Sequence, residues 1–201
     1  GPAAKQIEGP RGELVTLDPN GSKHLSVYST NEEKLHVKIH RVTPEEWARV
    51  KRWWSSWNWK DRKFGPLPGK KLLDTWVSVE AVPDQRVETR IDLAPYLTDG
   101  RGHLVVWVEG SEKPDSPWYG NFVAAWVQAT ELGLHAELDP KRLVTWVTSL
   151  QTGAPVEGAE VRIHPATTTA QTNAEGLAFQ DLPQRNTRMD QVLVVRKGGD
   201  V

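Results

Sequence analysis

Four of the ten tryptophans share one local pattern, in which each precedes a valine in a run of β-branched and aromatic residues. They are Trp76, Trp107, Trp126 and Trp146. Such residues fit a pleated, half-buried surface, so the pattern predicts four β-strands. Alternation supports further strands, since Leu35, Val37 and Ile39 alternate with polar neighbours. A period of two with one polar face is typical of antiparallel sheets that pack on one side.

One helix is expected among the strands. Thr43-Pro44-Glu45-Glu46 is a capping box with proline at the first helical position. Apolar residues then follow at helical spacing. These residues are Trp47, Val50, Trp54 and Trp57. The pattern predicts a helix over residues 44–58.

About eight or nine short strands with one helix indicate an all-β chain of two tandem immunoglobulin-like antiparallel β-sandwiches, the first with a helical insert. We expect the first sandwich over residues 12–124 and the second over residues 125–201. Residues 1–11 are expected to be a flexible N-terminus that begins with Gly1-Pro2, a pair typical of tag removal.

Composition excludes several kinds of site. The chain has no cysteine, which rules out disulfides, zinc–thiolate sites and a cysteine nucleophile within it. The net charge is −1 and no basic block occurs, so nucleic acid is not an expected partner. No run approaches the roughly 20 apolar residues of a membrane-spanning helix.

No catalytic, metal-binding or cofactor-binding residue is predicted, and the chain is not expected to be an enzyme. Common catalytic and phosphate-binding motifs are absent. His36 and His40 lie four residues apart, but on a strand that spacing spans roughly 13 Å, too far for two ligands of one metal. The aspartates beside turn signals, where this residue usually caps backbone amides, are Asp18, Asp92, Asp139 and Asp181. Asn20-Gly21-Ser22 fits both an N-glycosylation pattern and a turn.

A tryptophan cluster is the sharpest candidate for binding a partner. Its members are Trp53, Trp54, Trp57 and Trp59. One helix cannot bury all four rings on one face. They could contact a partner protein, a sugar or a membrane interface. The alternative is that the rings pack on the following loop or on a neighbouring domain. That loop, residues 60–71, is basic and expected to be exposed to trypsin-like proteases. Its candidate residues are Arg62, Lys63, Lys70 and Lys71.

Residues 122–134 end in Q-A-T-E-L-G-L, and residues 143–161 form a strand and the turn T-G-A-P-V-E-G-A-E-V. Residues 172–178 follow with T-N-A-E-G-L-A. These stretches resemble the macroglobulin-like domains of bacterial α2-macroglobulins, in which a T-x-x-x-G hairpin follows the turn. The turn motif alone is weak evidence for this family, because many immunoglobulin-like modules share it.

The first half is similar to the preceding domain of that family. It has a strand over residues 31–42 before the Thr-Pro-Glu-Glu helix, then Pro68-Gly69 before the next strand. Residues 91–97, I-D-L-A-P-Y-L, precede a G-H-L-V-V strand at residues 102–106. The resemblance covers nearly the whole chain. The order of the two domains is more specific to the family than any single motif.

The resemblance implies a non-catalytic scaffold within a large protein that traps proteases, with these two domains as the third and fourth macroglobulin-like domains, MG3–MG4. It implies no cofactor. The expected partners are neighbouring domains, target proteases bound by the longer protein, and a cell-envelope protein. The expected location is the periplasm or the cell surface. The family's thioester needs a cysteine, so no reactive residue carries over. The alternative function is an immunoglobulin-like binding module, in which the tryptophan cluster contacts a partner protein or cell-wall glycan.

Overall fold

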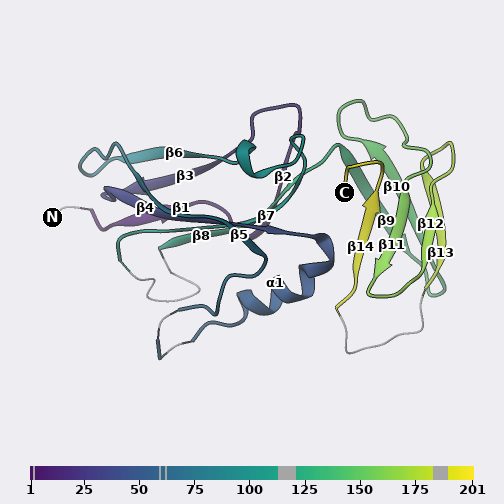
Figure 1. The fold of residues 1–201 in the computed structure, drawn as a ribbon, viewed down its shortest axis with the longest axis horizontal. Helices are drawn as coiled ribbons and strands as arrows, with labels where there is room; N and C mark the ends of the chain where they lie inside the picture. The colour runs from purple at the N-terminus through teal and green to yellow at the C-terminus, as the bar shows by residue number, and fades with distance from the viewer. Residues whose placement is uncertain (2, 59, 62, 113–120, 183–189) are drawn as a thin grey trace.

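The chain folds into two β-sandwiches side by side in a computed structural model, with one helix on the first (Figure 1). The structure describes residues 1–201 except 2, 59, 62, 113–120 and 183–189. Pro2, Trp59 and Arg62, which carried sequence-based expectations, lie outside the described residues. The predicted all-β class with a helical insert is confirmed.

Two facing sheets form the first sandwich. The smaller has the strand order β1-β3-β6 and the larger β2-β8-β7-β4-β5. The strands of the smaller sheet are β1 (Gln6–Glu8), β3 (His24–Thr30) and β6 (Arg86–Asp92). The strands of the larger sheet are β2 (Arg11–Leu17), β8 (Phe122–Ala129), β7 (Gly102–Glu109), β4 (Lys34–Val42) and β5 (Lys70–Ser78). Alternate residues of both sheets meet in one core, which contains Ile7, Val27, Val37, Val106 and Val123.

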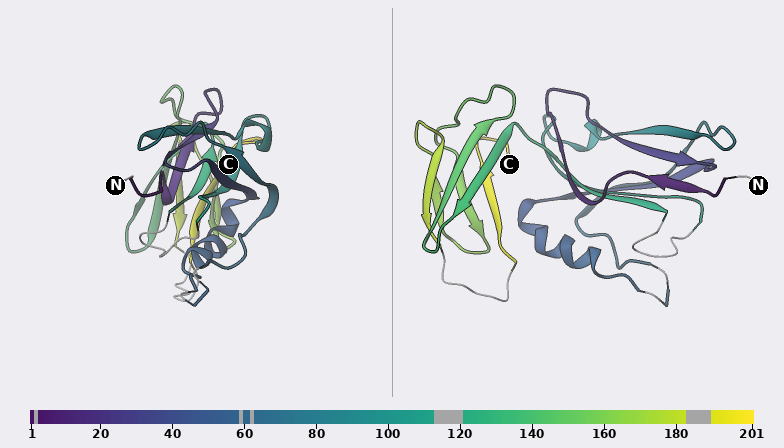
Figure 2. Two further views of the ribbon diagram at one scale, coloured as in Figure 1. Left: turned by 90° about the vertical axis from the view of Figure 1, so that its left-hand side faces the viewer. Right: turned by 180° about the vertical axis from the view of Figure 1, so that it is seen from behind.

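The helical insert covers the outer face of the larger sheet (Figure 2). It consists of a 3-10 turn, η1 (Pro44–Glu46), and the helix α1 (Trp47–Trp54). A second 3-10 turn, η2 (Ala94–Tyr96), follows β6. Because α1 lies on one face and the core on the other, β7 and β8 are buried on both faces. Both strands are therefore almost continuously apolar instead of alternating.

The helix begins where the sequence predicts and ends earlier. The Thr43 amide donates to the Glu46 carboxylate at 3.0 Å, as a capping box requires. The predicted end at residue 58 is wrong, because the helix ends at Trp54. The Ser56 hydroxyl and amide both bond to the Trp53 carbonyl, and an isolated bridge joins Asn58 to Lys63. These local bonds replace the next helical turn.

The domain boundary lies later in the chain than expected, because strand β8 belongs to the first sandwich. This strand pairs with β7 antiparallel and with β2 in parallel. The second sandwich begins after Thr130 with β9, and the predicted division between residues 124 and 125 falls inside a strand of the first. The parallel pair β2–β8 also departs from the purely antiparallel expectation. It follows from the N-terminal segment, which returns to the sheet beside a strand far along the chain.

The N-terminus, which was expected to be flexible, contributes a strand to the first sandwich. Strand β1 pairs with β3, and Ile7 is fully buried. The Ala3 amide donates to Asp84 at 2.7 Å, and the Ala3 carbonyl accepts from Asn31 at 2.8 Å. The N-terminal segment is therefore held by residues that are distant in sequence. Its three-residue strand is too short to show the alternation that predicts a strand.

The second sandwich has two three-stranded sheets, ordered β13-β10-β9 and β12-β11-β14. The strands of the first sheet are β9 (Leu132–Leu138), β10 (Arg142–Ser149) and β13 (Leu177–Asp181). Those of the second are β11 (Glu160–His164), β12 (Thr169–Gln171) and β14 (Val192–Arg196). Their buried core is small and consists of Val147, Ala159, Val161, Ala178 and Val195. The residues after β14 return to the first sandwich, and the C-terminus lies between the two sandwiches (Figure 2).

Candidate functional site

The tryptophan cluster predicted as a partner site is partly a second core. Trp53 is only 6% exposed, and its indole N–H donates to the Gly65 carbonyl at 2.8 Å. Its ring lies 5.6 Å from Trp107 and 5.2 Å from Phe64. Trp54 is half-buried, with its ring edge-on to Trp47. These contacts favour the packing alternative for Trp53.

The remaining candidates do not form one surface. Trp57 is half-buried against Phe64, with ring centroids 5.0 Å apart. Lys63 is exposed in the loop. Lys70 and Lys71 are also exposed, but they begin strand β5 and pair with β4, so their placement in a loop is wrong. A backbone held in a sheet ladder is a poor protease site, because cleavage needs an extended segment free of the sheet.

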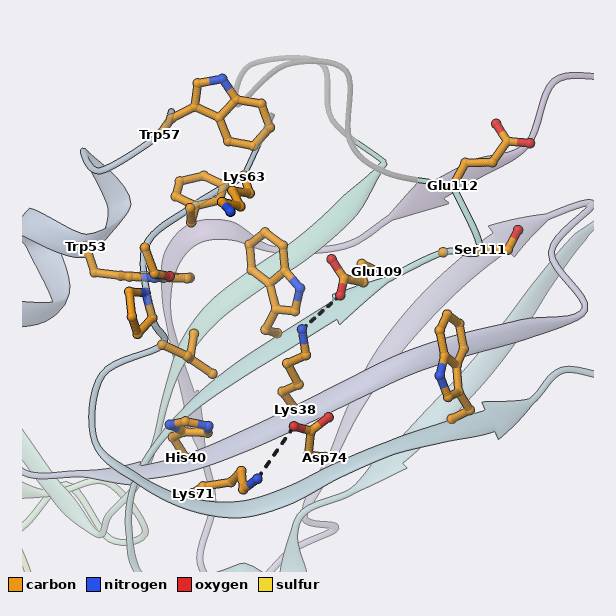
Figure 3. A pocket seen from close by; sticks show the side chains of 17 residues that line it. Lys38, His40, Trp53, Trp57, Lys63, Lys71, Asp74, Glu109, Ser111 and Glu112 are labelled. Atoms are coloured by element: carbon orange, nitrogen blue, oxygen red, sulfur yellow. Dashed lines mark hydrogen bonds and ion pairs between the residues drawn. The ribbon is translucent and has the colours of Figure 1, made fainter. Parts of the chain in front are cut away.

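A groove of about 580 Å³ lies beside this second core (Figure 3). Trp53, Trp57 and Lys63 stand at one side, and Lys38 and Glu109 are joined across the floor at 2.9 Å. Lys71 and Asp74 form a looser pair at 3.8 Å. Among the described lining residues, these two acidic and two basic groups compensate one another, so the four present no unpaired charge that selects an ionic ligand.

The two strand histidines have separate partners. His36 contacts Asp74 at 2.7 Å and Glu109 at 3.1 Å, and its ring stacks on Trp76. His40 bonds to the Pro68 carbonyl at 3.0 Å, and burial lowers its pKa. Within the described residues, no group of three or more histidine and acidic side chains could hold a metal ion.

All four turn aspartates were predicted to cap backbone amides, and three of them do so. Asp18 accepts from the Asn20 amide at 2.8 Å and Asp92 from the Ala94 amide at 3.0 Å. Asp139 accepts from the amides of residues 141 and 142, both at 2.7 Å, and these bonds lower its pKa. Asp181 is different, because it is 91% exposed and lies 3.8 Å from Arg142.

Three sets of polar contacts join the two sandwiches, and we call them together the joint. Its residues are Glu45, Arg101, His103, Thr130, Glu131, Arg196, Asp200 and Val201. The Asp200 carboxylate is 8% exposed and accepts from the Thr130 hydroxyl at 2.7 Å and the Glu131 amide at 2.8 Å. Arg101 lies 3.5 Å from the same carboxylate. Asp200 therefore fixes the C-terminal turn of the second sandwich to the segment that leaves the first.

Ion pairs surround this contact. Arg101 pairs with Glu131 at 3.0 Å, which raises the pKa of Arg101. Hydrogen bonds from Asn20 and Arg101 lower the pKa of Glu131. Arg196 on β14 contacts Glu45 on η1. Burial raises the pKa of Glu45, but the hydrogen bond and charge of Arg196 outweigh it, so the pKa is lowered. The lowered pKa values keep the Glu45 and Glu131 carboxylates charged at neutral pH.

Asp200→Ala is expected to destabilise the joint by about 2 kcal/mol, because it leaves the Thr130 hydroxyl and the Glu131 amide without their acceptor. Hydrogen exchange at residues 130–132 and 197–201 should accelerate. Asp181→Ala is the control, since this 91% exposed carboxylate has no such bonds and its loss should change neither measurement. Unchanged exchange in Asp200→Ala would show that Asp200 does not hold the joint.

Sequence reasoning missed the joint because its residues lie in four segments that are distant in sequence. Asp200 follows two glycines, which locally indicates only a turn. Arg101 and Glu131 carry no motif, and their pairing depends on where the second sandwich lies. No local pattern in the sequence could have identified them.

Comparison with known proteins identifies the fold. No protein-family model matches the sequence, and no curated protein matches it. Among solved structures, the NIE–MG1 domains of native alpha-2-macroglobulin from Escherichia coli match with a TM-score of 0.68 at 20% identity. That match covers 98% of this chain and 94% of the E. coli chain. A longer E. coli structure spanning MG0-NIE-MG1 gives a TM-score of 0.61 at 17% identity, over 98% of this chain and 62% of that one.

A larger structure also matches. Salmonella alpha-2-macroglobulin reacted with methylamine has a TM-score of 0.56 at 16% identity, over 96% of this chain and 12% of the Salmonella chain. The two sandwiches thus have the fold of a domain pair in bacterial alpha-2-macroglobulins. The resemblance found in the sequence is confirmed at the level of the fold.

Proposed function

We propose that this chain is a non-catalytic scaffold segment of a bacterial alpha-2-macroglobulin-like protein that traps proteases. The observation that carries the proposal is the match of both sandwiches together, over 98% of this chain and 94% of the NIE–MG1 structure. Single β-sandwiches recur in many unrelated proteins. A consecutive pair with the helical insert on the first is a far more specific arrangement.

The proposed position in the longer protein is that of the NIE–MG1 pair. The resemblance in sequence suggested MG3–MG4, which the comparisons leave untested. The match to NIE–MG1 supports the earlier position, because it covers both domains in order and nearly the whole of that structure. The role of such a segment is mechanical, since it would pass movement between neighbouring domains through a fixed joint.

The proposed partners are neighbouring domains and, through the longer protein, target proteases. The proposed location is the periplasm or the cell surface. Within the described residues, no helix combines the length and the apolar character of a membrane crossing. The scaffold role includes no chemistry in this chain, and no cofactor is needed for it.

The alternative, a binding module, has one supporting observation. The groove in Figure 3 is open and has Trp57 at its side. Against it, Trp53 is buried and the charges of the groove are paired. The scaffold role is therefore the better supported of the two.

Expression of the complete reading frame that contains this chain tests the proposal. We expect the full protein to shield bound trypsin from a large protein substrate while a small chromogenic peptide is still cleaved. Asp200→Ala in the full protein should weaken this shielding, and Asp181→Ala should not. A full protein that never shields a protease would refute the function. Turnover of any substrate by this chain alone would refute the non-catalytic role.

A further inference from the structure

His103 lies in the joint between a donor from one sandwich and an acceptor from the other. It is the second residue of strand β7 and is 6% exposed. The Trp126 indole N–H, also in the first sandwich, points at His103 Nδ1 at 3.0 Å. His103 Nε2 lies 2.9 Å from the Val201 carbonyl, which follows the second sandwich. Indole N–H only donates and a carbonyl only accepts, so the imidazole is neutral with its proton on Nε2.

We propose that His103 makes the joint acid-sensitive: a proton on Nδ1 abolishes the hydrogen bond from Trp126, and the joint opens and lets the second sandwich move. In the closed joint, the charged imidazolium would place two N–H donors against each other at 3.0 Å. It would also be a buried charge with no hydrogen-bond acceptor on that side, which is costly.

The packing around His103 determines on which side of the ring the joint can separate. Grooves of about 570 Å³ and 200 Å³ are both lined by His103 and Val201. On the Trp126 side the ring is held within the first sandwich, because Trp126 packs edge-on against Trp47 with centroids 5.6 Å apart. On the Val201 side, the hydrogen bond of His103 crosses from one sandwich to the other. Separation of Val201 from His103 therefore hydrates the ring without disturbing the packing of Trp126.

The charged groups that face His103 act in both directions. Burial is the largest influence and lowers its pKa from 6.5. Asp200 in the C-terminal turn and Glu45 on η1 favour the protonated ring, as does the Val201 carbonyl, whereas Arg196 on β14 opposes it. The net pKa is lowered, so the ring is neutral at pH 7.

The sign of the pH dependence follows from this shift. In the open joint the imidazole is hydrated and its pKa returns towards 6.5, so the open form binds the proton more tightly than the closed form. The closed joint is therefore fully favoured above pH 6.5 and loses stability as pH falls through the lowered pKa of His103. Uptake of one proton allows the ratio of open to closed forms to rise by at most about tenfold per pH unit.

Distance measurement between the sandwiches tests the proposal. The chain has no cysteine, so Glu80→Cys and Lys141→Cys place one fluorophore on each exposed site. We expect one narrow distance at pH 7.5 and a growing second population towards pH 5.0. A Gly-Ser extension after Val201 should be included, because it keeps the carbonyl and removes the terminal charge beside it. A distance that stays the same from pH 7.5 to pH 5.0 would overturn the proposal.

Two variants test whether the change of distance with pH depends on His103. His103→Gln can accept from Trp126 and donate to Val201 but cannot titrate, so its distance should not change with pH. It keeps Glu45, Glu131 and Asp200, so a response equal to that of the unmodified chain would assign the effect to carboxylates and refute the role of His103. His36→Gln is the control and should retain the acid response, because His36 bonds only within the first sandwich.

A second measurement covers the case in which His103→Gln does not fold. The six histidines of the unmodified chain can be titrated by nitrogen NMR. The midpoint of opening should coincide with the titration of His103. Coincidence with another histidine, or a midpoint below that of His103, would contradict the proposal. This test uses the isolated chain, so its result does not depend on whether the longer protein traps proteases.

Discussion

Trp53→Ala should lower the free energy of unfolding of the first sandwich by about 3–5 kcal/mol, the range for loss of a large buried aromatic side chain. The side chain is 6% exposed and lies in a cluster with Trp107, Phe122 and Ala124. Its removal would leave a cavity between α1 and the sheet. It would also remove the only donor to the Gly65 carbonyl among the described hydrogen bonds.

Urea unfolding, combined with hydrogen exchange on β7 and β8, measures this loss in the first sandwich separately from the second. Trp76→Ala and Trp146→Ala are matched controls, because these rings are 47% and 46% exposed. Each should cost no more than about 1 kcal/mol. A change below 1 kcal/mol for Trp53→Ala would contradict the packing role and return Trp53 to the candidates for partner binding.

Gly176→Ala should destabilise the second sandwich by about 3 kcal/mol, from backbone strain and overpacking together. Gly176 has φ = +76°, a conformation that alanine rarely adopts. An added Cβ would lie 2.5 Å from the Val147 carbonyl oxygen and 3.0 Å from Pro155. The Val147 carbonyl is not free to move, because Val147 is in the core and its amide bonds to the Gly176 carbonyl.

Gly153→Ala separates the two causes. Gly153 has nearly the same backbone, φ = +72°, but nothing lies within 4 Å of an added Cβ. It should therefore show only the backbone cost of about 1–2 kcal/mol. Thermal unfolding of both variants gives the comparison. If both variants lose the same stability, the contact between the added Cβ and the Val147 carbonyl oxygen contributes no destabilisation.

Local patterns were sufficient where the interaction itself is local. The capping box at Thr43 determined where the helix begins, because its bonds join residues three apart. The end of the helix was not predictable in this way. Trp57 continues the helical spacing, but Ser56 and the bridge from Asn58 to Lys63 turn the chain towards β5. Burial of Phe64 beside Trp53 and Trp107 stabilises that turn, and this contact exists only in the folded sheet.

The division into domains shows the same limit. The apolar run of β8 predicts a strand, but a strand of this kind could pair in either sandwich. Its partners are β7, joined through residues 110–121, and β2, more than 100 residues earlier. The joint is likewise made of residues from four segments, so its bonds could not be predicted before the position of the second sandwich was known.

The four tryptophans that precede a valine show what the sequence determined and what the tertiary structure decided. The sequence by itself established that all four lie on strands, because β-branched and aromatic neighbours favour that backbone. It could not tell their surroundings apart. Trp107 and Trp126 are 6% and 3% exposed, whereas Trp76 and Trp146 are nearly half exposed. The physical reason is coverage of the sheet face. Helix α1 lies over β7 and β8, while β5 is an edge strand and no helix among the described residues lies over the outer face of β10. A strand pattern fixes which way a side chain points, and only the packing of a distant element decides whether water reaches it.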